Sequence, residues 1–99
     1  MTVSKEYEMA IELIKKVMPE LDHLTNTEDR AVAKKIVYTI RDPITTAAYY
    51  IRVGNGPRKD ELLKVLRVLV SQMRDMSDIS LLKAYSKNLL SLMEEQRDG

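Results

Sequence analysis

The chain offers few side chains for catalysis or metal binding. His23 is the only histidine among the 99 residues, and the sequence contains no cysteine. Nucleophilic catalysis needs a nucleophile, a base that takes its proton and a group that orients the base. His23 also lacks a partner at the Glu-x-x-His or His-x-x-x-His spacing that places metal ligands on one helix face. We therefore expect no catalytic residue, no metal site, no cofactor and no enzymatic activity.

Gly54-x-Gly56 resembles a phosphate-binding loop only in its two glycines. No strand pattern precedes it, and neither a Lys-Ser pair nor a third glycine follows. The adjacent carboxylates at 60–61 and 94–95 are expected at exposed helix ends, where Asp60 and Glu61 suit the positive end of a helix. We interpret the glycines as a turn between helices and the carboxylates as surface charges.

The sharpest functional signal is a row of basic residues in the middle of the chain. Residues 30–59 contain seven Lys or Arg and one acidic residue, whereas residues 1–29 contain three Lys and seven Asp or Glu. At about 100° per residue of helix, four of these cations fall within about 40° of one another, flanked by a threonine and two tyrosines. The cations, which we call the basic ridge, are Arg30, Lys34, Arg41 and Arg52, and the flanking residues are Thr45, Tyr38 and Tyr49.

Such a ridge is typical of sequence-independent nucleic-acid binding. Guanidinium and ammonium groups bind phosphates, and the Thr and Tyr hydroxyls add neutral hydrogen bonds. The tyrosines also permit stacking with the bases of a single strand. The alternative is that the basic ridge is a solvated helix face, or that the acidic first segment lies beside it. The sequence leaves these alternatives open.

Size and composition predict one soluble globular domain over residues 1–99. The chain is 44% hydrophobic and 31% charged, with a net charge of +1. It lacks Cys, has no apolar run of the roughly 18–20 residues that span a membrane, and carries Lys5, Glu6 and Glu8 where a signal peptide would be apolar. We expect a cytoplasmic protein with no membrane partner. The low number of Asn and Gln residues, five in total, favours thermostability, whereas the six oxidation-prone Met residues argue against it.

Every long segment repeats apolar residues three and four apart, which predicts an all-α fold without strands. Helix starts follow from residues whose side chains accept hydrogen bonds from free backbone N–H groups. The expected caps are Ser4 or Thr2 for the first helix, the Thr25-x-x-Glu28 capping box or Thr27 for a second helix from about residue 28, and Ser77 for the last helix.

Prolines and glycines set the expected helix ends. Pro19 either stops the first helix near Val17 or kinks it. Asp42-Pro43 suggests a split into helices over 28–41 and 43–53, but the apolar residues keep one helical phase across Pro43, so we favour one long helix kinked there. Gly54-Asn55-Gly56-Pro57 predicts a reversal, because Gly and Asn readily adopt positive φ, and a helix over 57–76 follows it.

Four amphipathic segments joined by short turns predict a four-helix up-and-down bundle. The apolar arc of the third helix is broader than one seam needs, because it includes Val65, Val68, Leu69 and Val70. A broad arc indicates either a central position in the bundle or the face of a homodimer. Both interpretations stay open.

Residues 38–45, Tyr-Thr-Ile-Arg-Asp-Pro-Ile-Thr, are similar to the phosphoacceptor box of histidine-kinase dimerisation domains, whose pattern is His, acidic, apolar, Arg, any, Pro, Leu or Ile, Thr. Tyr38 stands at the phosphorylated His position and Thr39 at the acidic one, so this resemblance implies an inactive dimeriser.

In its length, absent Cys, scarce amides and helix-only pattern, the chain also resembles the small all-helical orphan proteins of filamentous viruses that infect hyperthermophilic archaea. That resemblance implies a viral accessory protein in the host cytoplasm.

Three function hypotheses follow. The first is a non-enzymatic helical interaction or accessory protein that binds a protein partner, which includes a second copy of itself. The second is a sequence-independent nucleic-acid-binding protein that uses the basic ridge. The third is a degenerate phosphotransfer module, which would require phosphorylation of Tyr38 or a response-regulator partner.

Overall fold

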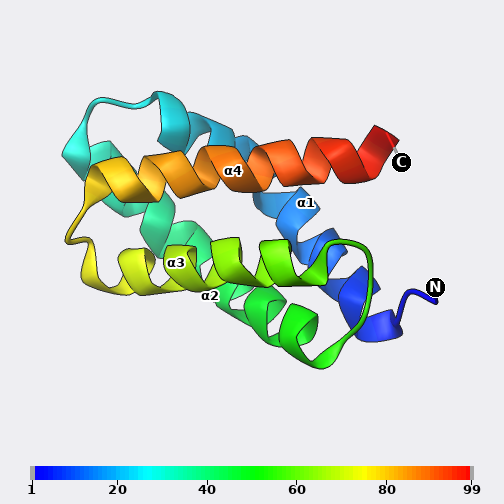
Figure 1. Cartoon of the computed structure of the whole chain (residues 1–99). Coiled ribbons are helices and arrows are strands. Elements are labelled where there is room, and N and C mark those ends of the chain that lie inside the picture. Colours follow the sequence, from blue (N-terminus) through cyan, green and yellow to red (C-terminus); the bar gives the residue numbers. More distant parts are fainter. Residues whose placement is uncertain (1, 99) are drawn as a thin grey trace.

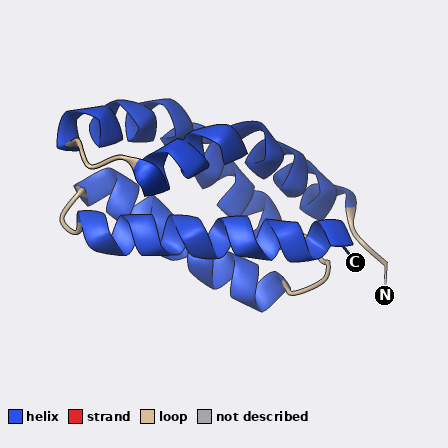
Figure 2. Cartoon of the chain, turned by 90° about the horizontal axis from the view of Figure 1, so that it is seen from above, coloured by secondary structure: helices blue, strands red, loops and turns tan. Residues whose placement is uncertain are grey.

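A computed structural model describes residues 2–98, with side chains through Glu95, and every regular element in that part of the chain is an α-helix. The helices are α1 (Lys5–Asn26), α2 (Arg30–Val53), α3 (Lys59–Asp75) and α4 (Ile79–Asp98). Short loops over 27–29, 54–58 and 76–78 join them (Figure 2). The predicted all-α fold is confirmed.

The helices form two layers. In Figure 1, α3 and α4 lie side by side in front, and α1 and α2 lie behind and cross them at an angle. Each helix packs against its neighbours in sequence, and α1 also packs against α4. Apolar side chains from all four helices form one buried cluster, with Ile14, Ile44, Leu66 and Leu89 fully buried. Over the described residues, no helix combines the length and the apolar character needed to cross a membrane.

Side-chain oxygens satisfy the free N–H groups where α1 and α2 begin. Ser4 Oγ accepts a hydrogen bond from the Tyr7 N–H at 3.2 Å, which confirms the predicted Ser4 cap. Asp29 Oδ1 accepts from the N–H groups of Ala31 and Val32, at 2.9 and 3.4 Å. A carboxylate at this end of a helix is further stabilised by the positive end of the helix dipole.

The predicted caps of α2 and α4 are wrong. Thr25 lies inside α1, where its hydroxyl donates to the carbonyl three residues earlier, and Thr27 Oγ1 accepts from the N–H of Asp29 rather than from the helix. At α4, Asp78 takes the place of Ser77, because its Oδ1 accepts from the N–H three residues later at 3.0 Å. In both cases a carboxylate near the predicted hydroxyl forms the cap, since a charged acceptor makes the stronger hydrogen bond.

Both interior prolines lie within continuous helices. Of the two outcomes expected at Pro19, an end of the first helix near Val17 is wrong, because α1 continues past Pro19. The long second helix is confirmed, and the split into 28–41 and 43–53 is wrong, because α2 is unbroken at Pro43. A proline in a helix interior costs about 3 kcal/mol, whereas each fully buried large aliphatic side chain contributes about 1.5–3 kcal/mol. The large side chains that are fully buried after the prolines are Leu21 and Leu24 in α1 and Ile44 and Ile51 in α2.

The loop between α2 and α3 fits closely around Tyr7, whose side chain is only 2% exposed. The Tyr7 hydroxyl donates a hydrogen bond to the Pro57 carbonyl at 2.5 Å. A Cβ atom at Gly56 would lie 2.5 Å from carbons of the Tyr7 ring, and one at Gly54 would lie 2.8 Å from the Tyr7 backbone nitrogen. The two glycines are therefore required because α1 approaches the loop too closely for any side chain.

The predicted reversal after α2 is confirmed, and the positive φ angles lie at other residues than its Gly and Asn. No described glycine has a positive φ; instead Arg58 (φ 58°) and Met76 (φ 53°) adopt the left-handed conformation at the two ends of α3. A left-handed residue interrupts the right-handed helix, so α3 is shorter than the predicted 57–76. At the far end, the Met76 N–H donates to the Gln72 carbonyl at 2.7 Å.

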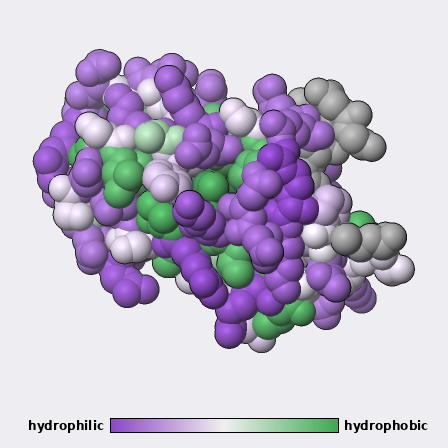
Figure 3. All heavy atoms as spheres, in the orientation of Figure 1, coloured by the Kyte–Doolittle hydropathy of each residue, from purple (hydrophilic) through white to green (hydrophobic). Residues whose placement is uncertain are grey.

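The broad apolar arc of α3 is used within the chain. Val65 and Leu69 are buried, Val68 and Val70 are half-buried, and α3 packs against both α2 and α4. Figure 3 shows hydrophobic side chains gathered along the seam between α3 and α4, with hydrophilic side chains around them. Two helical neighbours therefore account for the width of the arc, and the homodimer stays a prediction.

Candidate nucleic-acid interface

The basic ridge lies exposed along α2. The side chains of Arg30, Lys34, Arg41 and Arg52 are exposed, and so are those of Thr45, Tyr38 and Tyr49. The buried residues of α2, such as Ile40 and Ile44, form a separate arc that faces the core. All the predicted binding residues therefore occupy one side of a single helix, which holds them in fixed positions along about 36 Å of its length.

The acidic first helix does not lie beside the basic ridge. Thr46 and Tyr50 of α2 line a groove of about 500 Å³ together with residues of α1. In helical projection, Thr46 and Tyr50 are turned about 140° and 180° away from Arg41. The helix α1 therefore packs against the flank of α2 that is remote from the basic ridge.

The neighbour next to the basic ridge is α3. Arg41 and Thr45 line a cavity of about 170 Å³ with Arg74 of α3, and Asp42 also lines it. At the same end of α3, in the loop that leaves it, the Met76 carbonyl accepts a hydrogen bond from Arg30 Nη2 at 3.5 Å. Arg74 thus adds a further cation beside the basic ridge, and Asp42 offsets part of the local positive charge.

The contribution of α3 to this face was not predicted from the sequence. Arg67 lies seven residues before Arg74 and within about 20° of it in helical projection, and both side chains are exposed. Their spacing is visible in the sequence. The direction in which they point depends on how α3 packs against α2, so no signal in the sequence alone could place Arg74 next to Arg41.

The ion pairs of the described residues lie away from the basic ridge. Lys15 pairs with Glu12 in α1 at 3.8 Å. Arg58 pairs with Glu61 at 2.7 Å and also with Glu95 of α4. No described carboxylate forms an ion pair with a cation of the basic ridge, so its positive charge is available to a bound anion.

Two arginines of the basic ridge lie over the flanking tyrosines. The guanidinium carbon of Arg41 is 4.9 Å from the centre of the Tyr38 ring, and that of Arg52 is 5.4 Å from the centre of the Tyr49 ring. Such cation–π contacts contribute about 0.5–1 kcal/mol at exposed sites. No described residue accepts a hydrogen bond from either guanidinium. The rings therefore position the guanidinium groups and leave their N–H donors to solvent.

The other motifs of the sequence do not assemble into a site. His23 is exposed near the end of α1. Gly54 and Gly56 surround Tyr7, so their loop is filled by a side chain of the protein and is not an open phosphate cradle. Within the part of the chain that the structure describes, no group of three or more His, Asp or Glu side chains is placed to hold a metal ion.

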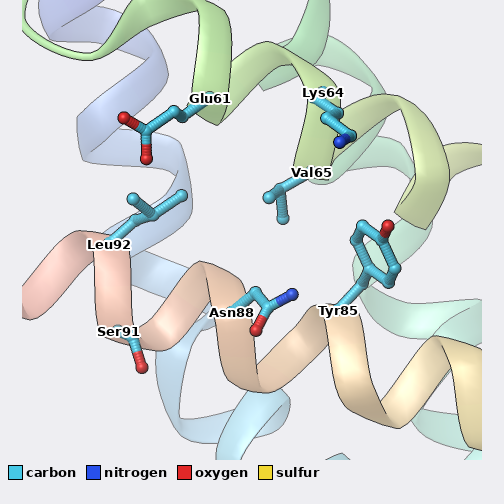
Figure 4. Close-up of a pocket in the computed structure, with 7 residues that line it drawn as sticks. All are labelled: Glu61, Lys64, Val65, Tyr85, Asn88, Ser91 and Leu92. Atoms are coloured by element: carbon cyan, nitrogen blue, oxygen red, sulfur yellow. The ribbon is translucent and has the colours of Figure 1, made fainter.

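A cavity of about 350 Å³ lies between α3 and α4 (Figure 4). Its lining residues are Glu61, Lys64, Val65, Tyr85, Asn88, Ser91 and Leu92. Figure 4 shows Glu61 and Lys64 at separate places on α3, with the apolar side chain of Val65 pointing into the gap between them. Among the described residues, no hydrogen bond joins two of the lining side chains.

Comparison of the chain with protein families, with curated proteins and with solved structures finds no match in any of the three. The exposed face of α2, where cations, hydroxyls and aromatic rings occur together, is therefore the candidate site.

Proposed function

We propose that this protein is a small non-enzymatic helical binding protein, and that its basic ridge binds nucleic acid without reading base sequence. One observation carries the proposal: four exposed cations follow one side of α2, and none is ion-paired with a described carboxylate. Phosphates bound by such cations release condensed counterions, which supplies affinity for any base sequence.

The arrangement that we propose for the helices is an up-and-down bundle. It is supported by the packing of each helix on its sequence neighbours and of α1 on α4, and a kink at Pro43 stays a prediction.

The test is the salt dependence of binding to fluorescently labelled DNA and RNA, followed by anisotropy. Each phosphate neutralised on a duplex contributes about −0.9 to the slope of log K against log salt concentration. Four contacts therefore predict a slope of about −3.6. A variant in which all four cations of the basic ridge are changed to Ala should lose binding at moderate salt and most of this slope.

A matched control removes the same amount of charge from other helices. The control variant changes four exposed lysines to Ala: Lys5, Lys15, Lys16 and Lys87. It should bind nearly as well as the unchanged protein, since three of these lysines lie on α1, remote from the basic ridge. An equal loss in both variants would show that net charge alone drives binding. Absence of binding by the unchanged protein at low salt would refute the proposal.

The second candidate function is binding of a protein partner, which includes a second copy of the chain. The observation that favours it is the groove between α1 and α2, where Met9 is 41% exposed and Leu13 and Tyr50 are half-buried. Light scattering on the same samples reports whether the protein self-associates. The kinship with histidine-kinase dimerisation helices and an origin among archaeal viruses stay predictions.

A further inference from the structure

The two tyrosines beside the basic ridge belong to a repeated pattern. Tyr38-x-x-Arg41 and Tyr49-x-x-Arg52 are eleven residues apart. Eleven residues are close to three full helical turns, so the second pair is rotated by about 20° from the first and displaced by about 16 Å along α2. In both pairs the arginine lies over the ring of the tyrosine three residues before it. The same aromatic and cationic unit therefore occurs twice on one face.

Burial in the core does not explain these two rings, although the centre of the Tyr49 ring lies 5.8 Å from that of the Tyr50 ring, at an angle of 59°. Tyr38 is 73% exposed and Tyr49 is 53% exposed, whereas Tyr7 is 2% exposed and Tyr50 and Tyr85 are half-buried against the core. An exposed aromatic ring held by a cation presents a large flat surface to solvent. A ligand that binds this surface immobilises the side chain at small entropic cost. Flat aromatic surfaces next to phosphate-binding cations are what an unpaired base can stack on.

We propose that the ligand of this face is single-stranded nucleic acid, with Tyr38 and Tyr49 as two base-stacking platforms and with Arg41 and Arg52 at the adjacent phosphates. This inference rests on the function proposed above and specifies its ligand. In a duplex the π-faces of the bases are already stacked, and a tyrosine reaches them only if the duplex is locally opened, which costs a few kcal/mol. A single strand offers its base faces without that cost, so the two platforms favour unpaired strands.

The experiment compares three probes with equal numbers of phosphates per strand: a labelled single strand, the duplex of the same sequence, and a strand that lacks its bases. A strand with a rise of 3.4 Å per nucleotide covers the roughly 36 Å of α2 with about 11 nucleotides, so short oligonucleotides suffice. At one fixed salt concentration, the single strand should bind at least about fivefold more tightly than the baseless strand for each ring that stacks.

The variant Tyr38→Ala/Tyr49→Ala should bring single-strand affinity down to that for the baseless strand. It should lower the affinity for duplex by a smaller factor, because a duplex loses only the hydroxyls and the support of Arg41 and Arg52, and no base stacking. The matched control Tyr38→Phe/Tyr49→Phe keeps both rings and should retain at least most of the single-strand preference. Circular dichroism of both variants checks that α2 remains folded, which is expected because both side chains are exposed.

Equal binding of single strand and baseless strand, or no effect of the Ala changes, would overturn this inference and leave the phosphate-binding function standing. Absence of binding to all three probes would refute the proposed function itself.

Discussion

Replacing Gly56 by Ala tests whether the packing of the loop around Tyr7 stabilises the fold. The added Cβ atom would lie 2.5–2.6 Å from three carbons of the Tyr7 ring. Favourable contacts between carbon atoms lie at about 3.5–4.0 Å, so either the ring or the loop must move. The ring has little room to do so, because Tyr7 is 2% exposed and its hydroxyl is fixed on the Pro57 carbonyl at 2.5 Å.

Two effects of opposite sign decide the outcome of Gly56→Ala. Replacing a glycine by Ala restricts the unfolded chain and raises stability by about 0.4–1 kcal/mol where the native backbone suits Ala. The backbone at Gly56 does suit Ala, since no described glycine has a positive φ. Overpacking a close contact costs about 1–3 kcal/mol, and loss of the Tyr7 hydrogen bond adds about 0.5–1.5 kcal/mol. We therefore expect the steric effect to dominate, with a net loss of about 1–3 kcal/mol.

Urea and thermal unfolding measure this loss. For a domain of about 100 residues, each kcal/mol lowers Tm by about 4–8 °C. Asn55→Ala is the matched control in the same loop, because its exposed side chain can be removed while its backbone N–H and carbonyl keep their hydrogen bonds to Ser4. In the Gly56→Ala/Tyr7→Leu double variant, the smaller side chain should relieve part of the penalty. A stability gain of about 0.4–1 kcal/mol in Gly56→Ala alone would refute the reasoning, because it would show that the entropic effect dominates.

Two further substitutions test the local determinants of α2. Asp29→Ala should lower the free energy of unfolding by about 0.5–2 kcal/mol in urea titrations, because its carboxylate caps the helix, whereas Glu28→Ala should change it by less than about 0.5 kcal/mol. A larger loss for Glu28→Ala than for Asp29→Ala would instead support the predicted Thr25-x-x-Glu28 capping box. Pro43→Ala should raise Tm and increase the free energy of unfolding by up to about 3 kcal/mol. The reason is that α2 is already continuous at this position and Ala supplies the missing backbone N–H donor. A lowered Tm would show that the proline ring contributes more through packing than it costs in the helix.

The helical periodicity of the sequence predicted the fold class and the core well, and predicted the helix ends less well. Periodicity reflects burial of a whole helix face, so a buried residue such as Leu69 was recognisable from spacing alone. Helix ends depend on competition among nearby acceptors, and at α2 the carboxylate of Asp29 forms the cap that was predicted for threonine. The left-handed conformations of Arg58 and Met76 follow from the packing of the two ends of α3, and residue type did not predict them.

The basic ridge was predictable because it is a property of one helix. Rotation by a fixed angle per residue places Arg41 and Arg52 on the same side of α2 whatever surrounds them. Its neighbours were not predictable, since they depend on which flank of α2 each partner helix covers. The sequence could not show that α1 packs on the side of Thr46 and Tyr50, nor that Arg74 lies next to Arg41.

The placement of α1 decides whether a nearly neutral chain can bind a polyanion. Had α1 covered the basic ridge, the five carboxylates of this helix would lie close to it and would cancel much of its field. The buried arc of α2 is instead covered by α1 on one flank and by α3 on the other, and the basic ridge borders α3. Because α3 contributes Arg74 there, the second neighbour extends the positive face. The net charge of +1 therefore says little about the potential that a ligand meets at α2, which depends on how the fold distributes charges of both signs.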